Sequence, residues 1–254
     1  MTAEGFVDFY SNEVVSDFSL RSAAAFVAAI RGYTNLTIGQ LFNRRRENRE
    51  SNLFGGGGEV DVSVAKSFED LRSASELVRH QYAARSYFAD TEHPDQNMRH
   101  ASKRATVILA CSGEQVVGTL TVVIDSPSGL LADEINRDLI GPLRSSGLRL
   151  GEVVRLAVRH QRDTDSRKVL AALFNAVHGL GVANGLDELL IEVNPRHVGF
   201  YRRALCFKVA GEERVCPRVN APSVLLRMRL TDLTRKIGSL EDAIAEFPLD
   251  QIRH

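Results

Sequence analysis

A long helix between two apolar strands is the feature that most restricts the fold of this chain. Its apolar side chains recur at helical spacing, and the stripe consists of Val169, Leu170, Leu173, Phe174, Val177 and Leu180. Ser166 is expected to cap this helix, which is expected to end near Gly181 and Gly185. Strongly apolar segments precede and follow it, at residues 152–158 and 189–193. A strand, a helix and a buried strand in this order predict a mixed α/β fold.

The segments around this unit add further strands and helices. Strands are predicted over residues 61–65, 105–110, 115–124 and 224–230, and helices over residues 68–88 and 198–205. Residues 129–148 are expected to form a loop-rich insertion with short helical segments. Helical spacing resumes after residue 232 and continues toward the C-terminus. Both ends of the mixed α/β region are therefore expected to carry helical extensions.

Four consecutive glycines, residues 55–58, mark the clearest boundary, because they lose much entropy on folding and offer no side chains to pack. We expect a helical arm over residues 1–54, a linker over 55–59, a main domain over 60–230 and a helical tail over 231–254. The arm either packs on its own domain or on a second copy, or its arginine-flanked amphipathic segment contacts a membrane surface or an acidic partner. The oligomeric state stays open.

Composition narrows the class of protein. The 254 residues include 32 Lys+Arg and 32 Asp+Glu, so the net charge of zero argues against a nucleic-acid footprint over the whole surface. The 3 cysteines are too few for a disulfide framework or a zinc ribbon. The first ten residues show no secretory signal, and the apolar run at residues 23–30 is far shorter than a bilayer span. A cytoplasmic protein, with peripheral membrane contact through the arm as the alternative, is expected.

Two motifs resemble those of a known superfamily. Residues 194–207 contain an Asn after a strand, then the pair Phe200-Tyr201, then Leu205-x-Phe207. This pattern is similar to the closing motif of the GCN5-related N-acetyltransferase superfamily, and residues 152–158 resemble its central strand. The resemblance implies a mixed central sheet flanked by helices, here with helical N- and C-terminal extensions.

Further motifs resemble a narrower group. The Glu-x-x-Arg of residues 152–155, together with residues 118–120 and 125–130, is similar to the autoinducer-synthase branch, whose members use acyl carrier protein thioesters. Residues 194–197 and 218–222 resemble the long-chain N-acyl amino acid synthases of that branch. The resemblance implies transfer of a long fatty acyl chain from the phosphopantetheine arm of acyl carrier protein to the α-amine of an amino acid. No permanently bound cofactor is expected.

The turn before the long helix bears on the donor. Typical acetyl-CoA users carry a glycine-rich turn there, whose backbone amides hold the pyrophosphate. Residues 161–166 contain no glycine and include Asp163 and Asp165, whose carboxylates would repel a pyrophosphate. This departure favours a carrier-protein thioester, which presents a single phosphate, over free CoA.

The catalytic candidates lie on the central strand. In a regular strand Glu152 and Arg155 point to opposite faces, but the superfamily's β-bulge would bring them together and free a backbone amide for the oxyanion. Glu152 is then the favoured general base, and Arg155 orients it or holds the acceptor carboxylate. The resemblance also assigns Val154 and Leu156 to substrate binding. An ion pair at a sheet edge is the structural alternative for Glu152 and Arg155.

Four more candidates follow the next strand. His197 is a second candidate for taking the ammonium proton, and Tyr201 lies one helical turn later, where related transferases place a tyrosine that protonates the leaving sulfur. Arg218 suits a free α-carboxylate, because guanidinium–carboxylate pairing is bidentate. The motif assigns Asn194 to substrate binding. The structural alternatives are a helix-capping histidine, a packed tyrosine and a solvated arginine.

Basic residues cluster in sequence around the expected thioester entrance: Arg159, Arg162, Arg167, Lys168, Arg202 and Arg203. Carrier proteins are acidic, so these side chains could steer one into place, although charge runs more often form a solvated face. The remaining histidines lack the spacing of metal ligands, so no metal site is expected.

Three rival functions remain for such a chain. An acyl-homoserine lactone synthase commonly has a tryptophan in its N-terminal acceptor region, and this sequence contains none. An acetyl-CoA N-acetyltransferase is disfavoured by the missing glycine turn. A non-catalytic acyl-binding module with the same fold is the rival outside the enzymes.

Overall fold

The computed structural model describes residues 60–84, 104–159 and 165–246. The predicted arm and linker, residue Arg162 and the last eight residues lie outside this part of the chain. Within it, eight strands form a mixed sheet in the order β1-β2-β3-β4-β5-β8-β6, with β7 also paired to β8. The mixed α/β prediction is confirmed.

The strands are β1 (Val60–Val64), β2 (Ala105–Ser112), β3 (Gln115–Ile124), β4 (Leu150–Val158), β5 (Glu188–Val193), β6 (Lys208–Val209), β7 (Arg214–Cys216) and β8 (Ala221–Arg229). The helices are α4 (Phe68–Ala83), α6 (Asp133–Ser145), α7 (Ser166–Ala183), α8 (Val198–Ala204), α9 (Leu230–Lys236) and α10 (Leu240–Ala245), with 3₁₀ turns η1 (Pro195–His197) and η2 (Ile237–Ser239). The sequence did not predict β6 and β7, because two or three residues are too few to show a period.

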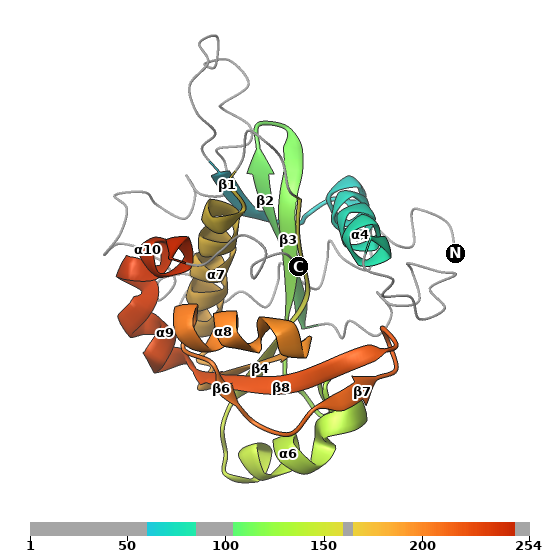
Figure 1. The fold of residues 1–254 in the computed structure, drawn as a ribbon, viewed down its shortest axis with the longest axis vertical. Coiled ribbons are helices and arrows are strands. Elements are labelled where there is room, and N and C mark those ends of the chain that lie inside the picture. The colour runs from blue at the N-terminus through green and yellow to red at the C-terminus, as the bar shows by residue number, and fades with distance from the viewer. Residues whose placement is uncertain (1–59, 85–103, 160–164, 247–254) are drawn as a thin grey trace.

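Helices cover both faces of the sheet (Figure 1). The apolar stripe of α7 lies on one face, where it forms the largest core cluster with side chains of β3, β4 and β5. On the opposite face α4 packs against β2, β3 and β4, while α6 covers a second cluster that includes Leu150, Leu190 and Leu225. The C-terminal helices extend the first layer, since Leu233 and Ile244 belong to the core cluster of α7.

Two local features of α7 differ from the sequence analysis. The N-cap is Asp165 and not Ser166: the Asp165 carboxylate accepts a hydrogen bond from the Arg167 N–H at 2.9 Å. At the other end the helix runs through Gly181, where an added Cβ would lie 2.9 Å from Leu230 Cδ1. Gly185, with a φ of +61°, follows the helix end instead.

The centre of the sheet opens between β4 and β5. These strands run parallel, and their pairing stops at Val153 and Ile191, although each strand continues. On its other side β4 carries a bulge: Val154 pairs with Thr121 and Ala157 with Thr119, so two residues oppose one. The bulge that the superfamily resemblance implied is therefore present in β4.

In the part of the chain that the structure describes, no helix is long and apolar enough to cross a membrane.

The contact between β3 and α7 gives a test of this packing. A Cβ on Gly118 would clash with Cγ1 of Val169, so Gly118→Ala is expected to lower the free energy of unfolding by about 1–3 kcal/mol. Gly199→Ala is the control, because its Cβ would meet only the flexible end of Arg203 at 3.4 Å. Urea denaturation followed by circular dichroism measures the free energy of unfolding of both variants. Equal values for Gly118→Ala and Gly199→Ala would contradict the close packing of β3 against α7.

Candidate active site

A cavity of about 1060 Å³ lies over the opening between β4 and β5. Its walls include Thr121 and Val154 on the α4 and α6 side of the sheet. They also include Val153, Ile191 and Tyr201, which belong to the core cluster on the α7 side. The cavity therefore reaches through the sheet where the two strands separate.

This cavity brings together every residue predicted from sequence to act in catalysis or substrate binding. Its lining contains Glu152, Val154, Arg155, Leu156, Asn194, His197, Tyr201 and Arg218. They come from β4, from the segment after β5 and from the loop between β7 and β8. Residues that are up to 66 positions apart in the chain, from 152 to 218, thus line one cavity.

Glu152 is fully buried and lines the cavity. Its carboxyl oxygens accept hydrogen bonds from two successive backbone groups, the N–H of Leu131 at 2.7 Å and that of Ala132 at 3.1 Å. Burial raises the pKa of Glu152 to about 8, with a further rise from the charge of Glu192, while the N–H groups and Arg218 oppose the shift. A carboxyl group with this pKa can both take and release a proton near neutral pH.

Glu192 is a cavity residue that the sequence analysis missed. It lies on β5 two positions beyond Leu190, the pairing partner of Glu152, so the two carboxyl groups are diagonal neighbours on the same face. Asn136 Nδ2 donates to Glu192 Oε1 at 2.9 Å, and Arg218 forms an ion pair with Glu192. The signal was present, because Glu192 interrupts the otherwise apolar run of residues 189–193 and a buried charge needs a partner.

Arg218 is bound on several sides within the protein. Besides Glu192 it pairs with the half-exposed Glu134, and its Nη1 donates to the backbone oxygen of Leu131 at 2.8 Å. The arginine therefore joins β5, α6 and the loop before α6. Arg218, which the sequence analysis expected to hold an α-carboxylate, lines the cavity with Glu134 and Glu192 already as its partners.

The β4 bulge contains the second member of the Glu-x-x-Arg motif. Arg155 has a φ of +54°, a conformation that costs a side-chain-bearing residue roughly 1–3 kcal/mol. Arg155 and Leu156 together oppose the single residue Leu120. Since β4 has no register partner in β5 beyond Val153, the bulge lies beside the opening between the strands.

The segment after β5 supplies the remaining predicted residues. Asn194 caps η1, its side-chain oxygen accepting from the Arg196 N–H at 3.2 Å. His197 is buried, and its Nε2 accepts a hydrogen bond from Arg196 Nε at 3.0 Å, so that lone pair is engaged. The Tyr201 ring packs edge-on against Phe174, Phe200 and Phe207. Burial raises the pKa of Tyr201, so its phenol keeps its proton.

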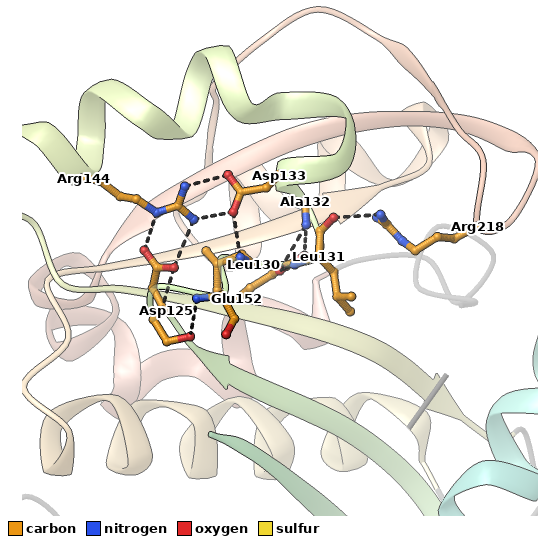
Figure 2. A network of polar contacts seen from close by, with 10 residues as sticks. Asp125, Leu130, Leu131, Ala132, Asp133, Arg144, Glu152 and Arg218 are labelled. Carbon is orange, nitrogen blue, oxygen red and sulfur yellow. Dashed lines mark hydrogen bonds and ion pairs between the residues drawn. The ribbon is translucent and has the colours of Figure 1, made fainter. Parts of the chain in front are cut away.

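A charged network supports the loop above Glu152 (Figure 2). Arg144 donates to Asp125 through Nε at 2.6 Å and to Asp133 through Nη1 at 2.7 Å. Asp133 in turn accepts from the Leu130 N–H at 2.7 Å. Sequence reasoning missed this network, because its members lie 19 and 11 positions apart and follow no helical or strand period.

Two of the predicted docking residues lie together. Arg202 and Arg203 line a groove of about 810 Å³ on the outer side of α8, which also contains Lys208, Arg235 and Lys236. Asp232 is the acidic residue of this lining and pairs with Arg235 at 2.8 Å. We name these five cations the basic groove.

The other docking candidates are not part of the basic groove. Arg159 follows the end of β4, and Lys168 is exposed on α7. Arg167 pairs with Asp165 at 3.0 Å. Arg162 lies outside the described residues.

Among the described residues, no group of three or more His, Cys, Asp or Glu side chains is arranged to hold a metal ion.

A central sheet opened beside a bulged strand, with a buried carboxyl group at the opening, agrees with the arrangement that the resemblance to the GCN5-related N-acetyltransferases implied. The family model described as N-acyl amino acid synthase FeeM matches residues 73–229, which is more than half of the chain. The chain belongs to this family of N-acyltransferases.

Solved structures agree with this assignment. FeeM, an N-acyl amino acid synthase from uncultured soil microbes, is 25% identical over 69% of this chain and 93% of its own, with a TM-score of 0.62. The AHL synthase LasI is 14% identical over 71% of this chain and 95% of its own, with a TM-score of 0.53, and shows the same fold. A search of curated protein sequences gave no significant match.

The buried carboxyl group makes stability depend on pH. The pKa of Glu152 is raised from 4.5 to about 8, so between these values the folded protein binds a proton that the unfolded chain has released. The free energy of unfolding is therefore expected to fall as the pH rises through this window. In Glu152→Gln the melting temperature should fall less steeply than in the parent protein. Thermal melts from about pH 5 to pH 8 check this. Glu114→Gln, which changes a residue in a turn, is the control, and its melting temperature should depend on pH as steeply as that of the parent protein.

Proposed function

We propose that the protein transfers a long-chain fatty acyl group from the thioester of acyl carrier protein to the α-amine of an amino acid. The observation that carries the proposal is the position of Glu152, buried beside the opening of the sheet with a pKa of about 8. In the reaction the amine nitrogen bonds to the thioester carbonyl carbon and the carbon–sulfur bond breaks. The acceptor enters as an ammonium and its nitrogen loses two protons in all: one is released through the base before the attack, and the other balances the proton that the leaving thiolate gains.

Glu152 is the proposed general base. An acceptor ammonium entering beside Glu152 and Glu192 favours their charged forms, so the cation prepares the carboxylate that removes its proton. A base with a pKa near the working pH combines the correct protonation state with a useful driving force. His197 is a weaker candidate in this geometry, because Arg196 occupies its Nε2 lone pair.

The bulge and Tyr201 suit the acyl end of the reaction. The bulge at Arg155 lies beside the opening, and a backbone N–H of the bulge is the proposed donor to the oxyanion on the thioester carbon. The phenol of Tyr201 keeps its proton and lines the same cavity, which suits protonation of the leaving sulfur. Arg218 is the proposed partner of the acceptor's α-carboxylate, in exchange for Glu134.

The cavity offers an apolar region for a chain longer than acetyl. Leu71, Ala74 and Val78 of α4 line it opposite Val107 and Val123 of the sheet. Its volume of about 1060 Å³ lies just above the range of roughly 300–1,000 Å³ found for ligand pockets. An acetyl group alone would leave most of this apolar space unfilled.

The start of α7 argues for a carrier-protein donor. In CoA-dependent relatives of this fold, a pyrophosphate would lie at this helix N-terminus, where backbone N–H groups bind anions. Here the Asp165 carboxylate already accepts from the Arg167 N–H. A second anion at that point would be repelled, whereas a phosphopantetheine arm carries a single phosphate.

The basic groove is the proposed docking surface for the acidic carrier protein. α8 carries Tyr201 toward the cavity and Arg202 and Arg203 toward the groove, so a protein bound in the groove lies one helix away from the reacting thioester. Because the proposed partner is acyl carrier protein, the proposed site of the reaction is the cytoplasm. Peripheral membrane contact through residues 1–54 stays part of the proposal.

The central test supplies purified protein with long-chain acyl carrier protein and a mixture of twenty amino acids. An N-acyl amino acid identified by mass spectrometry is the expected product. Product from acetyl-CoA and none from acyl carrier protein would overturn the proposal, and a lactone made from S-adenosylmethionine would favour the autoinducer synthases.

Glu152→Gln tests the base. Its kcat is expected to fall by about 10²–10⁴-fold, the usual contribution of general base catalysis. In the parent protein kcat/KM should rise with pH through about 8, because the carboxyl group must lose its proton first. Glu114→Gln is the matched control. Unchanged turnover in Glu152→Gln would show that another group accepts the proton.

Charge reversal tests the docking surface. The double substitution Arg202→Glu and Arg203→Glu is expected to raise the KM for acyl carrier protein by roughly tenfold or more at low salt, since electrostatic steering is lost. The parent KM should rise with ionic strength, while that of the variant should change little. Arg72→Glu reverses an exposed charge on α4, outside the basic groove, as a control. Equal effects of both variants would exclude this groove as the docking surface.

A further inference from the structure

One guanidinium group fastens both ends of the loop that covers Glu152. Arg144, in the last turn of α6, contacts Asp125 just after β3 through Nε at 2.6 Å and Nη2 at 3.0 Å. It also contacts both oxygens of Asp133, the first residue of α6. The side chains of Asp125 and Asp133 are only 14% and 8% exposed, so this bridge is largely shielded from solvent. Residues 126–132 form the loop between the two carboxylates.

The loop is held by its own backbone groups as well. Asp125 Oδ1 accepts from the Ser126 N–H at 2.9 Å, and Asp133 Oδ2 accepts from the Leu130 N–H at 2.7 Å. Gly129 lies between them with a φ of +79°, and a Cβ there would come within 2.8 Å of Asp133 Oδ2. A glycine at this position therefore allows the chain to approach the Asp133 carboxylate closely.

The same loop holds Glu152. The N–H groups of Leu130, Leu131 and Ala132 follow one another; the first donates to Asp133 and the next two donate to Glu152. The peptide orientation fixed by Asp133 is thus the one that directs the following donors at the Glu152 carboxyl group. Figure 2 shows this succession from Arg144 to Glu152.

We propose that Arg144 is a positioning residue for acyl transfer: by bridging Asp125 and Asp133 it holds the loop whose N–H groups fix the Glu152 carboxyl group. This inference rests on the proposed function, in which Glu152 is the base. Arg144 acts through Asp133 and the loop backbone, with Asp125 as its second anchor.

The loop also influences the pKa of Glu152. N–H donors stabilise the charged carboxylate, and the bonds from Ala132 and Leu131 oppose the rise in the pKa of Glu152. If the N–H groups turn away while the site stays closed to water, burial still raises the pKa of Glu152 and nothing from the loop opposes it, so Glu152 should hold its proton to higher pH and the amine should lose an oriented acceptor. The upward shift in the pKa of Glu152 and the loss of kcat would both result from the loss of these N–H donors.

The experiment compares Arg144→Ala and Arg144→Lys with Arg214→Ala. Arg214 is the matched control, because it makes a two-pronged ion pair with Asp138 on the same helix, at 2.6 and 2.7 Å, without touching the loop. Two quantities are measured against pH: kcat/KM, and the carboxyl ¹³C shift of Glu152 in protein labelled at glutamate Cδ. The Glu152 resonance is identified by its loss in Glu152→Gln.

In Arg144→Ala we expect kcat to fall at least about tenfold. The pH midpoint of kcat/KM and the pH midpoint of the Glu152 ¹³C titration should both move upward by about half a pH unit or more. Arg144→Lys should show smaller shifts of both midpoints than Arg144→Ala, because lysine keeps the positive charge but lacks the paired donors of the guanidinium group. Arg214→Ala should lower the melting temperature and leave both midpoints in place. Unchanged midpoints in Arg144→Ala, with only a lower melting temperature, would overturn the inference.

Two outcomes separate this inference from the proposed function. Full turnover in Glu152→Gln would refute the assignment of the base and with it the catalytic role of Arg144. The ¹³C titration of Glu152 in Arg144→Ala would still decide whether the bridge holds the carboxyl group. If Arg144→Ala does not fold, Asp125→Asn weakens the same bridge at one anchor, and the same shift in midpoints is required of it.

Discussion

The end of pairing between β4 and β5 at Val153 and Ile191 is the constraint on which the site depends. A continuous sheet would place backbone hydrogen bonds where the cavity now passes from one face to the other. The separation places the β4 bulge beside the cavity instead of beside paired residues of β5. The strands can diverge there because α7 packs under one face, while α4 and α6 cover the other.

Burying a carboxyl group at this opening requires compensation, and the fold supplies it from distant segments. Two N–H groups come from the loop before α6, and a guanidinium comes from the loop between β7 and β8. The neighbouring Glu192 acts in the opposite direction and raises the pKa of Glu152. The balance leaves an acid that is neutral in the free protein below about pH 8, and that an incoming cation can ionise.

Much of the fold was predictable from the chain alone, because its main elements carry strong periodic patterns. The stripe of α7 and the apolar strands on either side gave the correct central unit, and motifs around Glu152 and Tyr201 led to the family. The cap at Asp165 was assigned one residue too late, since aspartate and serine are equally good N-caps. The charge of Glu192 within an apolar run was visible in the sequence, but its partners and the network of Arg144 could not be predicted, because they are set by chain crossings and not by spacing.

The sequence by itself determined the order of elements, the apolar faces and the residue types of the site, since local periodicity and short motifs encode these directly. The tertiary structure decided which of those residues meet and in which protonation state. Burial, the diagonal approach of Glu192 and the N–H groups of the loop together shift the pKa of Glu152, and each depends on segments far apart in the chain. A pKa is a property of an environment, and the environment of Glu152 exists only once the sheet, α6 and the β7–β8 loop have come together.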